Sequence, residues 1–290
     1  MNSFKNHQRG GGIIFLLLAI WMGGEMACAR KKAVEMIVPY WTGKFPVIVI
    51  AHRGFSGQAP ENTLASFKKA IELGSDMIEL DVRFSKDGQV VVIHDNTIDR
   101  TTNGRGKVAD YTLKELKQFD AGSWFAPQFS GEQIPTLKEV LELAKGRIRV
   151  NIEIKNESLG QYAVTDLADR ALQEVKEAEM ADQIIFSSFY PSALTRIKQR
   201  DPRIWVALLY SRSWNYLPEI TGGNPFSVLN LRNSYLTKGK IATIHQKGMK
   251  VNVYTVNSEE EMQQFVEWGI DGIITNRPDR LIKILHKKFK

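Results

Sequence analysis

Short apolar runs rich in β-branched residues alternate with amphipathic stretches along most of the chain. In the first amphipathic stretch, Leu64, Phe67 and Ile71 recur at helical spacing, and Gly74 follows as a helix stop. Similar helical patterns occupy Thr136–Ala144, Tyr162–Ala178, Ser192–Gln199, Lys240–Gln246 and Glu259–Trp268. The strand-like runs are Val47–His52, Met77–Arg83, Val90–His94, Ile148–Lys155, Ile184–Phe189, Ile204–Tyr210, Val228–Leu231, Val251–Val256 and Asp271–Thr275.

This alternation over about 250 residues predicts an α/β protein, a TIM-type (β/α)8 barrel of parallel strands surrounded by helices. An open, doubly wound sheet is the rival architecture. It is disfavoured because neither a G-x-G-x-x-G loop nor a Walker A lysine motif follows the first strand, where Gly54 and Gly57 stand alone.

There are nine strand-like runs, one more than an eight-stranded barrel needs, and the third run accounts for the extra one. The connection Ser85–Gln89 is too short for a parallel crossover and contains an Asp-Gly pair, which predicts a hairpin. Such a hairpin would bring His94 beside Leu80. The stretch 96–135 that follows contains one convincing helix, Thr112–Asp120, so we expect it to be an insertion over one mouth of the barrel.

Two predicted strands carry charged residues on alternate positions and therefore on one face. Glu79 and Asp81 share a face of the second run, and Glu153 lies on the charged face of the fourth. Barrels of this type place their active sites at the carboxyl ends of the strands, where these three carboxylates would repel one another. A bound Ca²⁺ or Mg²⁺ would relieve that repulsion with oxygen ligands alone. The alternative is that Arg83 and Lys155 form structural ion pairs with these acids.

Two histidines end predicted strands. His52 closes the first run and is followed by Arg53, and His94 closes the third and is followed by Asp95. One histidine in such a place is usually structural, but two beside a carboxylate cluster predict a general acid/base pair. The other histidines, His7, His245 and His286, have no such context.

Composition and charge limit the classes of protein to which this chain can belong. The 290 residues are 43% hydrophobic and 24% charged, which is ordinary for a soluble globular protein. The net charge of +7 is mild and no basic block is interleaved with aromatic residues, so we expect no nucleic-acid partner. The single cysteine, Cys28, excludes an intramolecular disulfide.

The first 29 residues have the anatomy of a secretory signal peptide. Lys5 and Arg9 precede ten apolar residues, Ile13–Met22, and the small residues Ala27 and Ala29 flank Cys28. We therefore expect cleavage after residue 29 and an extracytoplasmic chain, periplasmic or secreted, in which residues 30–290 form a single catalytic barrel domain. A lipoprotein acylated on Cys28 is the alternative, although the residues before it depart from a lipobox. No other segment approaches transmembrane length.

The order of several short motifs carries a resemblance to a known family. The chain contains H-R-G, P-E-N-T, E-L-D, H-D and R-T-T-N-G in sequence from residue 52. This order resembles the glycerophosphodiester phosphodiesterase family. Further similar motifs, DAGSWF, IPTL, NIEIK, SSF, YTVN and GIITNRPD, extend the resemblance over about residues 47–282.

The resemblance implies a TIM-type barrel that hydrolyses a small molecule, a glycerophosphodiester, to glycerol 3-phosphate and an alcohol. It also implies that the insertion 96–135 shapes the substrate pocket. Glu61, the P-E-N-T acid, would act near the metal or on a substrate hydroxyl, although it also suits the start of the next helix. The remaining implied roles are catalysis by His52 and His94, metal binding by Glu79, Asp81 and Glu153, and phosphate binding by Arg53 and Lys155.

Two positions depart from the family pattern. Tyr254 stands where the family commonly has Trp, and Asn276 stands where Asp is common. We expect both to affect pocket contacts or strand-end hydrogen bonds rather than the chemical step.

Three other functions compete with this prediction. One is a phospholipase-like phosphodiesterase acting on intact lipid, with Trp124, Phe125, Phe129, Trp214 and Tyr216 lining either a small pocket or a lipid-facing rim. A second is a retaining glycosidase using Glu79 and Glu153. The third is a non-catalytic barrel protein that only binds. The sequence does not indicate the head group, the native metal, the attacking oxygen, which histidine is the acid, or the oligomeric state.

Overall fold

The computed structural model describes residues 43–155, 160–211 and 226–289. The predicted signal peptide with Cys28 lies outside these residues, as do Trp214 and Tyr216. The helices of the barrel are α2 (Leu64–Leu73), α4 (Leu137–Ala144), α5 (Val164–Glu177), α6 (Pro191–Arg200), α8 (Lys238–Gln246), α9 (Glu259–Glu267) and α10 (Pro278–Lys288). Its parallel strands are β1 (Ile48–Ala51), β2 (Met77–Phe84), β4 (Arg149–Ile154), β5 (Ile184–Ser188), β6 (Trp205–Tyr210), β7 (Val228–Arg232), β8 (Lys250–Tyr254) and β9 (Gly272–Thr275).

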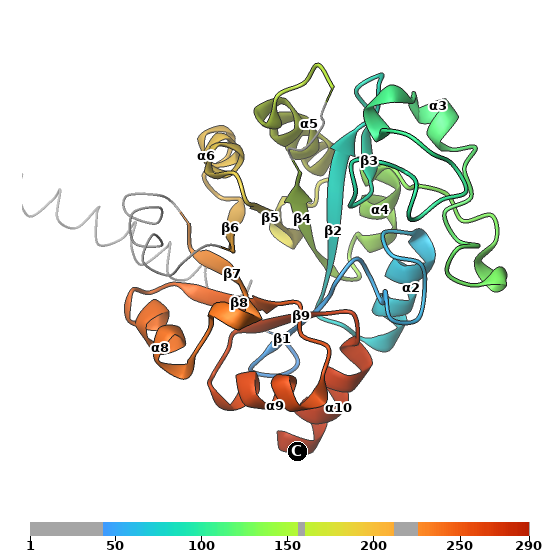
Figure 1. Cartoon of the computed structure of the whole chain (residues 1–290). Coiled ribbons are helices and arrows are strands. Elements are labelled where there is room, and N and C mark those ends of the chain that lie inside the picture. Colours follow the sequence, from blue (N-terminus) through green and yellow to red (C-terminus); the bar gives the residue numbers. More distant parts are fainter. Residues whose placement is uncertain (1–42, 156–159, 212–225, 290) are drawn as a thin grey trace, which may run out of the picture. The chain divides into compact units, whose positions relative to one another are not determined.

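The eight parallel strands close into a barrel with the helices outside (Figure 1). Each strand pairs with its neighbours in the order β1-β9-β8-β7-β6-β5-β4-β2, and β1 also pairs with β2. That last pairing leaves no open edge, so the TIM-type barrel is confirmed and the doubly wound sheet is excluded.

The alternating pattern of β2 explains how the barrel is built. Ile78, Leu80 and Val82 are fully buried in the apolar core under the helices. The intervening Glu79 and Asp81 therefore point to the inside of the barrel. The predicted strand faces are thus confirmed, and they place charged side chains in the interior.

The hairpin predicted after β2 is present. β3 (Val90–Val92) pairs antiparallel with β2, with Phe84 opposite Val90. The backbone N–H of Ile93 donates to the carbonyl oxygen of Asp81 at 3.0 Å, which carries the ladder on toward His94. The third strand-like run therefore delivers its histidine to the barrel without becoming a barrel strand.

The insertion has its own small apolar core, and β3 separates this core from that of the barrel. Val90 and Val92 belong to the barrel core. Val91 and Ile93, on the other face of β3, pack with Leu116 and other apolar residues of the insertion. The period of two along β3 thus allows this one strand to pack against both apolar cores.

The helix predicted over Thr112–Asp120 is shorter than expected. It forms α3 (Leu113–Leu116), capped by Thr112. The helical ladder stops because the backbone N–H groups of Gln118 and Phe119 donate three residues back, to Glu115 and Leu116, and the N–H of Asp120 donates to Oδ1 of Asn103. These bonds compete with further helical turns.

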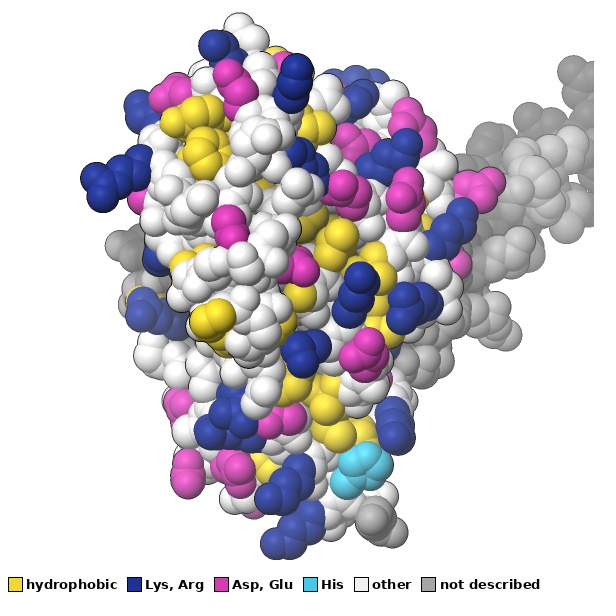
Figure 2. Space-filling view, turned by 90° about the vertical axis from the view of Figure 1, so that its right-hand side faces the viewer, with side chains coloured by type: hydrophobic (Ala, Val, Ile, Leu, Met, Phe, Trp, Pro, Cys, Tyr) yellow, Lys and Arg dark blue, Asp and Glu magenta, His cyan; other side chains and the backbone are white. Residues whose placement is uncertain are grey.

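The surface on the side of the insertion is mixed in charge. Figure 2 shows this face, where Lys and Arg side chains are interspersed with Asp, Glu and small apolar areas. Among the described residues, no helix is both long and apolar enough to cross a membrane.

Candidate active site

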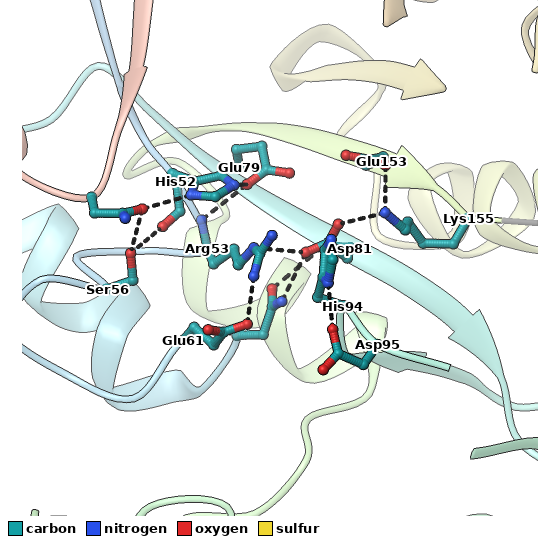
Figure 3. A network of polar contacts seen from close by, with 12 residues as sticks. His52, Arg53, Ser56, Glu61, Glu79, Asp81, His94, Asp95, Glu153 and Lys155 are labelled. Carbon is teal, nitrogen blue, oxygen red and sulfur yellow. Dashed lines mark hydrogen bonds and ion pairs between the residues drawn. The ribbon is translucent and has the colours of Figure 1, made fainter. Parts of the chain in front are cut away.

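The predicted site residues come together at the carboxyl ends of the barrel strands (Figure 3). His52 and Arg53 follow β1, His94 follows β3, and the acids lie on β2 and β4. Except for Glu61 and Asp81, these residues line a cavity of about 190 Å³. The cavity is lined by His52, Arg53, Glu79, His94, Asn151, Glu153, Lys155, Ser187, Phe189, Leu209, Asn230, Tyr254, Thr255 and Ile274.

The turn after β1 directs Arg53 into the site. Arg53 has a left-handed backbone with φ of 55°, and its N–H donates to Oε2 of Glu79 at 2.9 Å. Gly54 follows with φ of 80°, and a Cβ there would lie 2.4 Å from Oγ of Ser66. The glycine of H-R-G therefore serves both the turn and the close packing of α2 against it.

Three buried carboxylates converge beside the cavity. Glu79, Asp81 and Glu153 each offer one oxygen, and these oxygens lie within 4.8 Å of one another. Burial, together with the charges of Asp81 and Glu153, raises the pKa of Glu79 well above its usual value. Burial also raises the pKa of Glu153 to about 7, with Asp81 adding to the rise and Lys155 opposing it.

This donor set fits a hard divalent cation. All three ligand atoms are carboxylate oxygens, and the raised pKa values of Glu79 and Glu153 indicate that the protein's own cations do not fully compensate the negative charge. Asn151, which pairs in register with Glu79, has a buried Oδ1 without a hydrogen-bond partner among the described residues. Carboxylate oxygens are ligands that both Ca²⁺ and Mg²⁺ accept, so the cluster would suit either ion by ligand type.

Two cations of the chain balance part of the acidic charge (Figure 3). Arg53 Nε lies 3.4 Å from Asp81, while Lys155 Nζ lies 2.8 Å from Glu153 and 3.6 Å from Asp81. Burial opposes ionisation of Asp81, but Arg53 and Lys155 outweigh it and hold the pKa of Asp81 below its usual range. The Glu153–Lys155 ion pair considered as the alternative therefore exists, and it coexists with the acidic cluster. Arg83 donates to the carbonyl oxygen of His94 at 2.9 and 2.7 Å.

His52 is held by the residue at which the chain departs from the family pattern. Its Nδ1 lies 2.6 Å from Oδ1 of Asn276, and its Nε2 lies 4.0 Å from Glu79. Burial, followed by the positive charge of Arg53, lowers the pKa of His52 to about 4. His52 is therefore neutral near pH 7, with Nε2 on the side of the acidic cluster.

His94 has a carboxylate partner instead of an amide. Its Nδ1 lies 2.6 Å from Oδ1 of Asp95. Burial lowers the pKa of His94, and the nearby Asp81 and Asp95 carboxylates oppose this shift. The carboxylate partner favours the protonated ring more than the amide that faces His52.

Glu61 lies apart from the acidic cluster. Its Oε1 accepts from Nη1 of Arg53 at 2.7 Å, and both of its oxygens accept from Arg100 at 2.7 and 2.8 Å. Glu61 does not line the 190 Å³ cavity. Its predicted contact with substrate stays a prediction, whereas its contact with Arg53 is direct.

Several residues of the site were not singled out by sequence reasoning. Asn62 Nδ2 donates to Asp81 at 2.9 Å, and Arg100 binds both Glu61 and Asp95. The P-E-N-T and R-T-T-N-G motifs contain these two residues, and a search for side chains able to reach the acids could have found them.

The aromatic residues separate into two groups. Tyr254 lines the cavity, which agrees with the expectation that it affects contacts in the pocket. Trp124 and Phe125, and then Phe125 and Phe129, form edge-to-face pairs within the insertion and are absent from the cavity lining.

The fold and the mouth of the barrel together are typical of a TIM-barrel enzyme with its active site at the carboxyl ends of the strands. Comparison with known proteins gives the family. The pattern of the glycerophosphoryl diester phosphodiesterase family matches residues 52–280, and the chain belongs to this family. It is therefore an enzyme, a glycerophosphodiester phosphodiesterase, rather than a protein that only binds.

Individual relatives cover most of the chain. A glycerophosphodiester phosphodiesterase of Caldanaerobacter subterraneus subsp. tengcongensis is 41% identical over 247 residues, which are 83% of this chain and 98% of the relative. One of Bacillus altitudinis is 36% identical, covering 81% and 97%. The structure of an Oleispira antarctica phosphodiesterase in complex with the product sn-glycerol-3-phosphate has a TM-score of 0.76 and 33% identity, covering 83% and 97%.

Proposed function

We propose that this enzyme hydrolyses glycerophosphodiesters to glycerol 3-phosphate and an alcohol, using two histidines and one divalent cation. The observation that carries the proposal is the buried cluster of Glu79, Asp81 and Glu153, whose ligand oxygens lie within 4.8 Å of one another beside the cavity that His52 and His94 line. The product bound to the Oleispira antarctica relative supports a small glycerol phosphate as one product. The cation is Ca²⁺ or Mg²⁺, and when bound it stabilises charge on the phosphoryl oxygens.

Arg53 and Lys155 would bind the phosphate. Both line the cavity and both are fixed by carboxylates, Arg53 by Glu61 and Lys155 by Glu153. A phosphodiester carries one negative charge, and hydrolysis builds more on its oxygens. Two fixed cations in a mostly buried mouth would therefore favour the transition state over the substrate.

The proton transfers would be divided between the histidines. The pKa of His52, lowered to about 4, leaves this ring unprotonated near pH 7 and able to accept a proton from the attacking oxygen. His94 has the carboxylate of Asp95 to stabilise an imidazolium and would protonate the leaving alcohol. The attacking oxygen belongs either to water or to the glycerol 2-hydroxyl.

The experiment measures release of glycerol 3-phosphate from glycerophosphocholine, with and without EDTA. Wild-type activity should vanish with EDTA and return with Ca²⁺ or Mg²⁺. His52→Ala and His94→Ala should each lower kcat by about 10²–10⁴-fold, with strongly non-additive losses in the double variant. Full activity in a verified metal-free preparation, or near wild-type turnover of both variants, contradicts the proposal.

A change of leaving group separates the two roles. The p-nitrophenyl ester of glycerol 3-phosphate releases a stable anion that hardly needs a proton. His94→Ala should therefore lose much less activity on this ester than on glycerophosphocholine, whereas His52→Ala should lose about as much on both. Equal losses for both variants would remove the acid assignment. Turnover of phosphatidylinositol vesicles in preference to glycerophosphocholine would instead establish the phospholipase alternative.

We further propose that the enzyme is exported. The support is the ten-residue apolar run Ile13–Met22 followed by Ala27 and Ala29. N-terminal sequencing of the processed protein should begin at Arg30. A blocked, acylated Cys28 would establish the lipoprotein alternative, and an intact Met1 in the cytosolic fraction would exclude both.

A further inference from the structure

One exposed arginine of the insertion joins two carboxylates that serve different parts of the site. Arg100 Nε donates to Asp95 at 2.6 Å, and its two terminal nitrogens donate to Glu61 at 2.8 and 2.7 Å. The guanidinium thus binds both acids through its planar fork. Neither Asp95 nor Glu61 nor Arg100 lines the catalytic cavity.

The Asp95 branch ends on His94. Although partial burial raises it, hydrogen bonds from Arg100 and His94 lower the pKa of Asp95 to about 2. Asp95 is therefore ionised near neutral pH and can only accept a hydrogen bond. The 2.6 Å contact then requires the proton of the neutral His94 ring on Nδ1. Nε2, in a ring that lines the cavity, is therefore the nitrogen that gains a proton when the imidazolium forms and releases it when His94 acts as an acid.

The Glu61 branch ends on Arg53. Glu61 Oε1 accepts from Arg53 Nη1 at 2.7 Å while Arg53 Nε lies 3.4 Å from Asp81. The guanidinium of Arg53 is thus hydrogen-bonded to Glu61 through Nη1 and attracted to Asp81 through the charge on its Nε side, which favours one direction across the mouth. Arg100 donates to both oxygens of Glu61, including the Oε1 that Arg53 also binds, so it fixes the carboxylate that fixes Arg53.

We propose that Arg100 is a positioning residue that orients His94 through Asp95 and Arg53 through Glu61. One guanidinium from the insertion thereby sets the ring nitrogen that His94 presents to the cavity and the direction of the phosphate-binding arginine. The insertion then takes part in assembling the active site, although none of its residues lines the 190 Å³ cavity. The kinetic part of this proposal rests on the proposed function, in which His94 and Arg53 act on substrate.

A purely structural role predicts a different result. The side chain of Arg100 is 44% exposed, and exposed ion pairs add little to the free energy of unfolding. Removal of Arg100 should therefore leave the unfolding temperature almost unchanged while activity falls. Arg105 provides a matched control, because it lies in the same insertion, is exposed, and its guanidinium makes no ion pair with a described residue.

The first test compares Arg100→Gln, Arg100→Lys and Arg105→Gln with glycerophosphocholine as substrate. Arg100→Gln should lower kcat/KM by about 10- to 100-fold, as expected when a group that orients catalytic residues is lost. Arg100→Lys should recover little, since an ammonium cannot bind both carboxylates as a fork. Arg105→Gln should stay within about twofold of wild type. In a Glu61→Gln, Asp95→Asn background, Arg100→Gln should have less than a twofold effect.

The second test is independent of activity. Ring ¹⁵N signals of His94, assigned by their loss in His94→Gln, should show one tautomer protonated on Nδ1 in wild type and a tautomer mixture in Arg100→Gln. An unchanged tautomer overturns the proposal even when the rate falls. An active wild type whose Arg100→Gln rate stays within twofold of Arg105→Gln also overturns it. If wild type hydrolyses no glycerophosphodiester, the proposed function fails, and the ¹⁵N spectra alone decide whether Arg100 orients His94.

Discussion

Glu153→Gln should stabilise the metal-free enzyme at alkaline pH. Glu153 is buried and its pKa is raised from the usual 4.5 to about 7 by burial and by Asp81, against the opposing charge of Lys155. In the absence of a cation, the ionised carboxylate is thus unfavourable in the folded state. Glutamine has nearly the same shape as the protonated acid and carries no charge.

The sign and size follow from proton linkage. Below pH 4.5 Glu153 is protonated in both the folded and the unfolded state, so its ionisation does not change the free energy of unfolding. Between pH 4.5 and 7 the unfolded state loses the proton first, and wild-type stability falls as the pH rises. The loss is complete above pH 7, where a shift of this size corresponds to about 3 kcal/mol. Glu153→Gln should therefore gain about 3 kcal/mol over wild type at pH 8 and nothing at pH 4.

The assay is urea unfolding at several pH values, first in EDTA and then with Ca²⁺ or Mg²⁺. Glu174→Gln is the matched control: Glu174 lies on α5 outside the barrel, and burial also raises its pKa to about 7. In EDTA at pH 8 both variants should be more stable than wild type. An ion at 100 times its dissociation constant stabilises wild type by about 2.7 kcal/mol. That gain should erase most of the advantage of Glu153→Gln and leave that of Glu174→Gln unchanged.

Two results would refute this reasoning in different ways. If Glu153→Gln gains nothing in EDTA at pH 8, burial does not disfavour the charge of Glu153. If its advantage persists with either ion present, as in Glu174→Gln, then Glu153 is not a metal ligand.

Three further substitutions test the surroundings of the site. Asn276→Asp places a carboxylate on Nδ1 of His52 and should raise the pKa of His52 from about 4 by about 1–3 units, measured by NMR titration of the chelated protein. Gly54→Ala combines a φ of 80° with a Cβ 2.4 Å from Ser66 Oγ and should lower the free energy of unfolding by about 2–5 kcal/mol in urea. Leu116→Ala removes a fully buried side chain from the insertion core and should cost about 2–5 kcal/mol in the same assay. An unshifted titration or an unchanged urea midpoint would contradict the corresponding argument.

Local patterns in the sequence were sufficient to predict the barrel and the direction of the site residues on its strands. Alternation within β2 and β4 predicted that Glu79, Asp81 and Glu153 face the interior, since period two decides the face of every strand residue. The Asp-Gly turn predicted the hairpin that brings His94 to β2. These features depend on neighbours a few positions apart.

The contacts that orient the site could not be predicted in this way. Asn276 and His52 are 224 positions apart, and Arg100 and Glu61 are 39 apart. No periodicity links residues on separate loops, and their distance depends on how the closed barrel brings the loops together. The length of α3 was also missed, because the backbone N–H of Asp120 donates to Asn103, 17 positions earlier, rather than continuing the helix.

The two faces of β3 have a consequence for how the molecule unfolds. Because Val90 and Val92 belong to one apolar core and Val91 and Ile93 to another, neither core can lose this strand without exposing the other. The insertion and the barrel should therefore open as one cooperative unit rather than as a stable domain with a loosely attached lobe. Amide hydrogens buried in the insertion should then exchange with solvent as slowly as those of β2. If another segment replaced this insertion, its apolar residues would have to pack against Val91 and Ile93 while Val90 and Val92 kept their contacts with the barrel core.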